Sequence, residues 1–370
     1  MPDARIASSI REVGRDAWDR LFPGQIETWD YLCAVETAGL PGFKWRYVLV
    51  ADGGRLVCVT PMFMTDYPID TTLDGAGREL AHAVTRLFPR ALTLRLACLG
   101  SPCTETLTVG FAPELTPDAR VSVAALLLQA FEAEAGRAGC GLLGIKDAPE
   151  DQSVLWDRVA VRAGYGRVPG LPVAWLPIDF ADREAYLERL SPSTRKDMRR
   201  KLRSESQLRI EVRADLDGML DRVMDLYRQT RARAEMTLED LTPAYFQGVC
   251  ETMPGRVVHI LYWQGDDLIA ANMLLRDDAV LIDKFFCMDA ARGRALNLYF
   301  LSWFRNIDYC LEHGLTRYQS GQAAYEVKLR LGSRLIRTAM LFRHRNPLVN
   351  GALRLAAPLF AADPTLEMAA

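Results

Sequence analysis

The 370-residue chain has few of the residues that metal and redox sites require. It contains four histidines, and its eight cysteines are scattered without a C-x-x-C pair. We therefore expect no bound metal, and we interpret the cysteines as free buried thiols in a reducing compartment. An excess of charge is also missing, since the formal net charge is -2. The molecule as a whole thus has no strong bias toward nucleic acid.

Long apolar segments are absent as well. No uninterrupted run approaches the roughly 20 residues that a membrane-spanning helix needs, and the polar residues 1–16 lack the apolar core of a secretory signal. We therefore expect a cytoplasmic protein without a membrane span. The apolar stretch 348–360 is short and interrupted by Asn350, Arg354 and Pro358. We interpret it as a packed or peripheral terminal helix.

The most informative pattern lies at residues 316–332. An extended run ends at Ser320, Gly321 permits a tight turn, helix formers dominate 322–331, and Gly332 stands where a left-handed cap would end a helix. A helical pattern precedes this segment and another extended run follows it. Helix, strand, polar turn, helix and strand together predict an α/β unit with a site at a strand's carboxyl end.

The same order of elements occurs earlier in the chain. A helix, a short strand, a second helix and a further strand are predicted at 117–139, 141–146, 151–163 and 173–178. In the second half the corresponding segments are 296–313, 316–320, 322–331 and 335–344. A β-meander precedes each series, at 45–64 and at 256–287. This repeat predicts two similar domains.

The second half, above all 296–345 with Tyr325-Glu326 and the Leu331-Gly332 ending, resembles the GNAT acyltransferase superfamily. It is more specifically similar to the bacterial Fem-type (FemAB-like) branch, in which one chain carries two GNAT-like domains. The resemblance implies an α/β fold with two mixed, twisted sheets flanked by helices. We expect an N-terminal GNAT-like domain at 1–180, a helical connector with a basic helix at 181–255, a C-terminal GNAT-like core at 256–346 and a tail at 347–370.

The resemblance implies an N-acyltransferase that moves an acyl group from a thioester to a small-molecule amine. The donor would be acyl-CoA or an acyl carrier protein, acting as a co-substrate. Two alternatives stay open: an aminoacyl-tRNA-dependent Fem-type transferase, and a non-catalytic GNAT-like binding protein. The sequence does not determine the oligomeric state.

Two residues are candidates for proton transfer. The resemblance puts Tyr325 in the position of the tyrosine that protonates the leaving group, although an ordinary packing role explains it equally well. Asp283 and Lys284 interrupt the apolar strand 279–287, and adjacent residues of a strand point to opposite faces. We predict that Asp283 is the base or the amine-binding carboxylate; a structural pair with an arginine is the competing interpretation.

The superfamily's diphosphate loop aligns with residues 290–295. Gly293 and Ala295 fit its pattern, Ala290 does not, and Arg292 and Arg294 would favour an anion. Lys328 shares a helix face with Tyr325, so it could hold a phosphate or carboxylate. The remaining candidates are expected to contact the substrate, the last two from the first domain: Asn272, Gln319, Ser320, Gln322, Thr104 and Glu105.

The helix at 195–203 carries six basic residues. A solvated face is the interpretation we favour, because no aromatic residues are interleaved with the charges. A contact with RNA is the alternative.

Overall fold

The computed structural model describes residues 2–68, 93–233 and 238–357. The end of the predicted tail, 358–370, lies outside these residues. The chain divides into two compact units, which are each built around one mixed sheet. Among the described residues, unit 1 comprises those up to 172 and 337–357, and unit 2 comprises those between 173 and 336.

The unit 1 sheet has the strand order β1-β2-β3-β4-β6-β15-β7, with β5 paired to β3. Neighbours are antiparallel except for the parallel pair β4–β6. The predicted hairpin joins β2 to β3, where Gly53 and Gly54 both have positive φ. The strands are β1 (Asp3–Ala7), β2 (Lys44–Asp52), β3 (Arg55–Pro68), β4 (Thr93–Leu99), β5 (Gly110–Phe111), β6 (Leu142–Pro149), β7 (Gly166–Pro169) and β15 (Thr338–His344).

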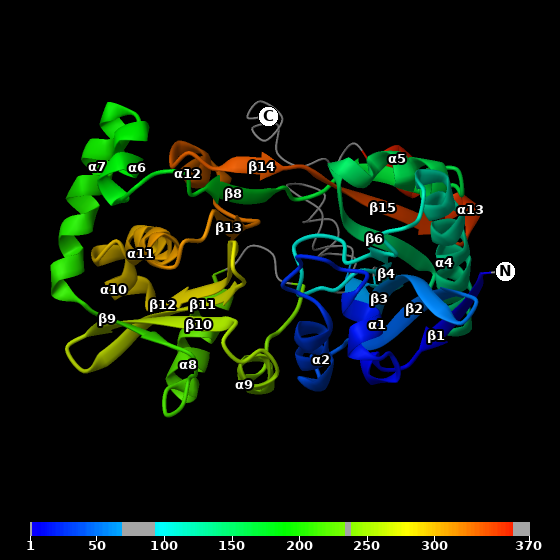
Figure 1. The fold of residues 1–370 in the computed structure, drawn as a ribbon, viewed down its shortest axis with the longest axis horizontal. Coiled ribbons are helices and arrows are strands. Elements are labelled where there is room, and N and C mark those ends of the chain that lie inside the picture. Colours follow the sequence, from blue (N-terminus) through cyan, green and yellow to red (C-terminus); the bar gives the residue numbers. More distant parts are fainter. Residues whose placement is uncertain (1, 69–92, 234–237, 358–370) are drawn as a thin grey trace, which may run out of the picture. The chain divides into compact units, whose positions relative to one another are not determined.

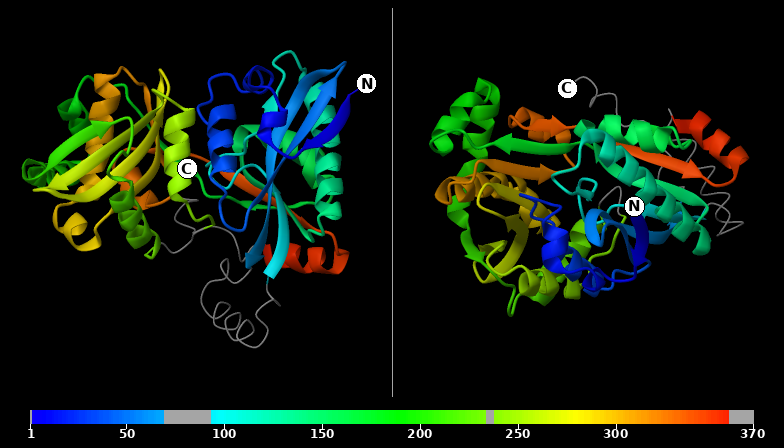
Figure 2. Two further views of the ribbon diagram at one scale, coloured as in Figure 1. Left: turned by 90° about the horizontal axis from the view of Figure 1, so that it is seen from below. Right: turned by 45° about the vertical axis from the view of Figure 1, so that its right-hand side comes forward.

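Helix α4 (Pro117–Arg137) packs across β1, β2 and β3 of this sheet (Figure 2). It buries Val123, Leu127 and Phe131 on one face, as its apolar spacing predicts. The other helical elements of unit 1 are η1 (Ile10–Glu12), α1 (Arg15–Asp19), α2 (Trp29–Thr37), η3 (Glu150–Gln152), α5 (Ser153–Trp156), the π-helix η4 (Asp157–Val161) and α13 (Pro347–Ala356).

The unit 2 sheet has the order β9-β10-β11-β12-β13-β8-β14, and its parallel pair is β12–β13. Its strands are β8 (Val173–Pro177), β9 (Arg209–Arg213), β10 (Val257–Gln264), β11 (Asp267–Arg276), β12 (Val280–Met288), β13 (Arg317–Gly321) and β14 (Arg334–Ile336). The two sheets therefore have the same strand order, which confirms the predicted mixed α/β fold with an internal repeat.

Helices cover both faces of the unit 2 sheet (Figure 1). α11 contacts β12 and β13, while α8 contacts β11 and β12. The core under α11 includes Leu274, Leu281, Trp303, Phe304 and Tyr318. The helical elements of this unit are α6 (Arg183–Arg189), α7 (Pro192–Leu202), η5 (Arg203–Gln207), α8 (Leu220–Arg231), α9 (Pro243–Thr252), α10 (Ala290–Ala295), α11 (Leu298–Glu312) and α12 (Tyr325–Arg330).

The two halves exchange one strand each. β8 follows the first series of elements but pairs with β13 and β14, and β15 follows the second series but pairs with β6 and β7. The expected single strand 335–344 is therefore two strands in different sheets. Domain limits at 180 and 346 do not coincide with this division. A local pattern specifies a strand but not the partner strand it joins, which is why the sequence suggested simpler limits.

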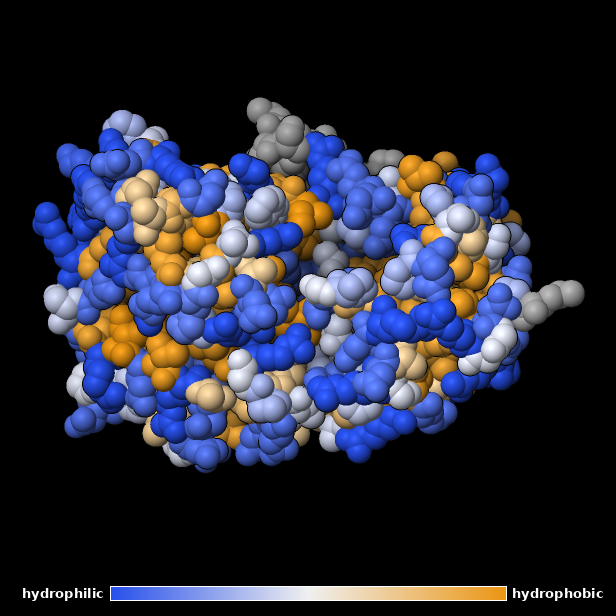
Figure 3. All heavy atoms as spheres, in the orientation of Figure 1, coloured by the Kyte–Doolittle hydropathy of each residue, from blue (hydrophilic) through white to orange (hydrophobic). Residues whose placement is uncertain are grey.

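Residues 181–255 do not form a separate connector. They supply β9, which pairs with β10, and helices that pack within unit 2. The basic helix α7 lies in a region with a largely hydrophilic surface (Figure 3). Its Arg199 pairs with Glu184, and its Lys201 pairs with Asp197 at 2.9 Å. None of the helices in the described part of the chain is long and apolar enough to cross a membrane.

Candidate functional site

In the unit 2 sheet, β12 and β13 separate after Ile282, early in β12. β12 and β13 pair over three positions, which end at Ile282 opposite Gln319. β12 then continues to Met288 along β11 alone. A β-bulge sits at this point, because Leu274 pairs with Asp283 and Met273 with Phe285, leaving Lys284 as the extra residue. Bulges re-aim side chains and end pairing, so the separation is built into the strand.

Asp283 is the first residue beyond the paired segment. Its Oδ2 accepts hydrogen bonds from Tyr318 Oη at 2.9 Å and from Asn306 Nδ2 at 3.2 Å. Asn306 Oδ1 in turn accepts from Asn272 Nδ2 at 3.3 Å. Asp283 and Asn272, both predicted from the sequence as site residues, therefore belong to one polar cluster on the α11 side of the sheet.

The carboxyl group of Asp283 is tuned by its surroundings. Burial raises its pKa to about 6, although the hydrogen bond from Tyr318, the charge of Lys328 and the two asparagine amides all act to lower it. The net shift is upward because the free-energy cost of removing the ionised carboxyl from water exceeds the stabilisation that these partners give it. A carboxyl with this pKa is ionised at neutral pH and can still accept a proton from an amine.

Several buried polar atoms around Asp283 lack partners among the described residues. These are Tyr262 Oη, Tyr299 Oη and Asn272 Oδ1. Burial first, and then the negative charge of Asp283, raise the pKa of both tyrosines. Unsatisfied buried polar atoms are rare in native proteins, and although others occur elsewhere in both units, these three are consistent with a site that takes a polar group.

Tyr325 opens α12, directly after Ala324 with φ 54°. The left-handed Ala324 bends the chain sharply, so that Tyr325 starts a helix close to the end of β13. Tyr325 is partly buried and lies one helical turn before Lys328, on the same face as predicted. Its role as a proton donor stays a prediction.

Lys328 is buried at 4% exposure. Its Nζ donates hydrogen bonds to the main-chain oxygens of Ser320 and Gly321, the latter at 3.1 Å. The ammonium group thus holds the end of β13 and its charge acts on Asp283. This arrangement disfavours the expected role as an open phosphate ligand.

The other predicted contacts have separate locations. Ser320 Oγ donates to the main-chain oxygen of Ala174 at 3.3 Å, and Gln319 and Gln322 are partly buried in unit 2. Thr104 and Glu105 belong to unit 1, where the Thr104 hydroxyl bonds main-chain oxygens of its own loop. Substrate contacts by these residues stay predictions.

The expected diphosphate loop is the short helix α10. Asp289 caps it, with Oδ1 accepting from the main-chain N–H groups of Ala291 at 3.1 Å and Arg292 at 2.9 Å. Arg292 also pairs with Asp267 at 2.7 Å. Gly293 is buried, and a Cβ there would come within 2.5 Å of Met288 Sδ. The donors that a diphosphate would need are therefore engaged by carboxylates of the chain itself; Arg294 and Ala295 are exposed.

Sequence reasoning missed Tyr318 and Asn306, which are both almost completely buried and both bond Asp283. The available signal was Asn306, a polar residue on the apolar face of a predicted helix and seven residues after Tyr299. Residues seven apart lie on the same face two turns apart, so a shared polar site was deducible.

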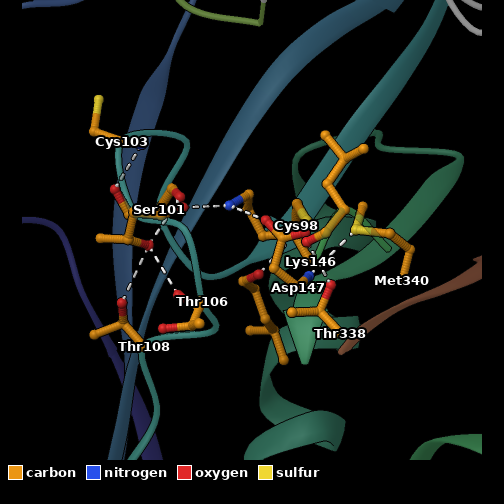
Figure 4. A network of polar contacts seen from close by, with 12 residues as sticks. Cys98, Ser101, Cys103, Thr106, Thr108, Lys146, Asp147, Thr338 and Met340 are labelled. Carbon is orange, nitrogen blue, oxygen red and sulfur yellow. Dashed lines mark hydrogen bonds and ion pairs between the residues drawn. The ribbon is translucent and has the colours of Figure 1, made fainter. Parts of the chain in front are cut away.

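Unit 1 has a different arrangement at the equivalent position (Figure 4). β4 and β6 pair up to Leu99 opposite Ile145, and the chain then turns at Gly100. Leu107 N–H bonds the main-chain oxygen of Asp147 at 3.0 Å, so the following loop continues along β6. The Lys146 Nζ bonds Thr104 O at 2.7 Å and pairs with Asp147 at 2.5 Å. This site is filled by the chain's own groups.

The fold and the opened sheet define a class, the acyltransferases with two GNAT-like domains. A family model for FemAB-like proteins, described as peptidoglycan biosynthesis/recognition, matches residues 152–355. The chain belongs to the FemAB-like family. The resemblance read from the sequence is thereby confirmed, as is the prediction of an acyltransferase. A search of curated proteins found no match.

Solved structures with the same fold have low sequence identity to the chain. FemX is 14% identical with a TM-score of 0.60, over 95% of this chain and 100% of FemX. A tandem GNAT protein from the clavulanic acid biosynthesis pathway is 13% identical with a TM-score of 0.55, over 93% and 98%. The C-terminal domain of a putative lysylphosphatidylglycerol synthetase from Agrobacterium fabrum is 12% identical with a TM-score of 0.54, over 93% and 96%.

Proposed function

We propose that unit 2 transfers an acyl group to the amine of a peptidoglycan precursor. The observation that carries this proposal is Asp283, a carboxyl with a pKa of about 6 at the point where β12 leaves β13. Membership of a family described by peptidoglycan biosynthesis supports the choice of acceptor.

The proposed chemistry assigns the proton transfers to two residues. The ionised Asp283 takes a proton from the acceptor's ammonium group, and the neutral amine then attacks the acyl carbonyl. Main-chain N–H groups of β12 beyond its paired segment polarise that carbonyl. As the carbon–oxygen or carbon–sulfur bond to the donor breaks, the Tyr325 hydroxyl protonates the leaving atom, and the second proton lost by the attacking nitrogen restores the Tyr325 hydroxyl, which leaves a neutral amide.

We further propose aminoacyl-tRNA as the donor. Asp289 occupies the N–H groups at the start of α10, and Asp267 holds Arg292, so a second anion would meet two carboxylates there. Free coenzyme A needs a binding site for its diphosphate at the start of α10, whereas an aminoacyl ester has no diphosphate to place there. The thioester expected from the sequence becomes the second candidate, and a carrier-protein thioester fits it better than free coenzyme A.

A transfer assay distinguishes these donors. We expect purified protein to move a radiolabelled aminoacyl group from charged tRNA to a peptidoglycan precursor with a free amine, and ribonuclease to abolish the transfer. Release of free thiol from acyl-CoA or acyl carrier protein, with ribonuclease present, would instead establish the thioester donor. No transfer from any of the three donors would refute the proposal.

The role of Tyr325 has its own test. Tyr325→Phe removes the hydroxyl and keeps the ring, so we expect the rate of transfer to fall by roughly 10²-fold while acceptor binding stays the same. Tyr309→Phe is the control, since this tyrosine lies at the far end of α11 against His313. Unchanged turnover in Tyr325→Phe would leave its ring with a packing role alone.

A further inference from the structure

A row of side chains crosses three strands of the unit 2 sheet. Trp175 in β8 pairs with Gln319 in β13 on one side and with Arg334 in β14 on the other. Residues directly opposite each other in a sheet point to the same face. Arg317 lies two residues before Gln319 and therefore shares this face. Its guanidinium carbon is 4.6 Å from the Trp175 ring centroid, and that of Arg334 is 5.5 Å away.

Within the described part of the chain, the two arginines on this ring have no counter-charge. Among the described residues neither side chain has a carboxylate within 4.0 Å or a hydrogen bond of its own. Arg317 Nε is buried without a partner, and burial lowers the pKa of this guanidinium. Arg334 and Trp175 are at least partly exposed. A positive charge that is partly removed from water and left unpaired is costly, so the pair needs an explanation.

Other arginines over aromatic rings in the same unit provide the contrast. Arg209 lies 4.5 Å from the Trp263 ring and pairs with Glu211 at 3.0 Å. Arg183 lies over Phe304 and pairs with Glu205 at 2.8 Å. Stacking on a ring is thus usually combined with charge neutralisation in this unit, and the Trp175 pair departs from that combination.

We propose that Arg317, Arg334 and Trp175 form a binding site for a phosphate-type oxyanion. Guanidinium groups bind phosphate through parallel N–H donors, and stacking on one indole fixes the planes of both forks. Gln319, in the row, is also the last residue of β13 that pairs with β12, and it points to the face opposite Tyr318 and the Asp283 cluster. Its use by a substrate of acyl transfer rests on the proposed function; its binding of the oxyanion does not.

Binding is tested without turnover. Wild-type protein is titrated with inorganic pyrophosphate and inorganic phosphate by calorimetry, and acetate serves as the carboxylate comparison. We expect pyrophosphate to bind more tightly than acetate, with an affinity that falls as salt rises. Arg334→Gln, a change at an exposed side chain, should weaken pyrophosphate at least tenfold, and Arg317→Lys should weaken it while keeping the charge.

Arg209→Gln is the matched control, since this arginine also stacks on a tryptophan but has a carboxylate partner. It should leave pyrophosphate affinity unchanged. The proposal is overturned if wild-type protein does not bind pyrophosphate at millimolar concentration, or if Arg209→Gln weakens binding as much as Arg334→Gln does.

Turnover kinetics then identify which substrate carries the phosphate. Arg334→Gln should raise the KM of the acceptor if the phosphate belongs to the acceptor, and the KM of the charged tRNA if it belongs to the donor, with kcat little changed. Pyrophosphate binding without any acyl transfer would refute the proposed function and leave the oxyanion site standing. Transfer with unchanged KM values for both substrates in Arg334→Gln would refute the use of this site in the reaction.

Discussion

The two units share one strand order, but they differ at the point where the parallel pair of strands ends. In unit 2 the strand β12 extends past its parallel partner, and Asp283 lies at that point in a cluster with unpaired polar atoms. In unit 1 the strand β4 ends at its last pair with β6, while β6 continues to Pro149, and the loop after β4 bonds this extension through Leu107 and Lys146. Near Asp283, unit 2 thus retains buried polar atoms without partners among the described residues, whereas the polar groups at this position in unit 1 bond one another.

The difference shows that a fold repeat does not imply a repeated activity, because chemistry depends on which groups are left unsatisfied. Lys146 and Asp147 satisfy each other, and both are buried. Asp283 accepts hydrogen bonds from neutral donors, so its charge stays available for a substrate.

The largest expected effect is a difference in kcat between variants of Asp283 and of Asp147. Asp283→Asn removes the proton acceptor and should lower kcat by roughly 10²- to 10⁴-fold. Asp147→Asn, on β6 just beyond the last β4–β6 pair of unit 1, should leave kcat within a factor of about two, since asparagine tolerates the positive φ of 50° at this residue. Equal losses of activity in the two variants would mean that unit 1 also takes part in the chemistry.

The next prediction concerns the free energy of unfolding rather than kcat. Lys146→Met leaves Asp147 buried without its partner and should lower the free energy of unfolding by about 3–5 kcal/mol. The double variant Lys146→Met with Asp147→Asn should recover much of this loss, because the uncompensated charge is gone. Chemical denaturation measures the unfolding free energy of both variants. A Lys146→Met variant as stable as wild type would show that the Lys146–Asp147 pair does not stabilise unit 1.

The pH dependence of Asp283 sharpens the contrast further. Because its carboxyl must be ionised to act, kcat/KM should rise with pH through about 6, and Asp283→Asn should lack this rise. The folded-state pKa is above the ordinary value of 3.8, so the contribution of Asp283 to stability is full below about pH 4 and is lost as pH rises through about 6.

The same linkage gives a stability measurement. Relative to wild type, Asp283→Asn should gain up to about 3 kcal/mol between pH 4 and pH 8, at roughly 1.4 kcal/mol for each pH unit of difference in pKa. Thermal or chemical denaturation at the two pH values tests it. A difference between the proteins that does not change with pH would show that Asp283 has an ordinary pKa.

The smallest effect concerns the helix caps. Asp289→Ala removes the side-chain cap of α10 and should cost about 1 kcal/mol of unfolding free energy. Asn346→Ala removes the equivalent cap of α13 in unit 1, where Asn346 accepts from Leu348 N–H at 2.9 Å, and it should cost a similar amount. If Asp289→Ala is neutral, Asp289 does not hold the N–H groups of Ala291 and Arg292 in solution.

The sequence by itself determined the class of fold and the repeat, and it identified Asp283 as a candidate site residue. Glycine turns and alternation of apolar residues are local, so Gly321 and Gly332, both with φ 86°, were deducible as a turn and a helix end. Asp283 stood out because a charge in an apolar strand needs a partner or a function. For the same reason, Asn306 on the apolar face of its helix was a signal within reach.

Only the tertiary structure decided which strands exchange between the sheets, that Lys328 holds β13, and that Asp289 fills the expected anion position. Each of these depends on contacts between residues far apart in the chain or on competition for one set of donors, and local periodicity contains neither. The contacts of Arg317 and Arg334 with Trp175 also depend on the tertiary structure, because they require β8 to pair with both β13 and β14.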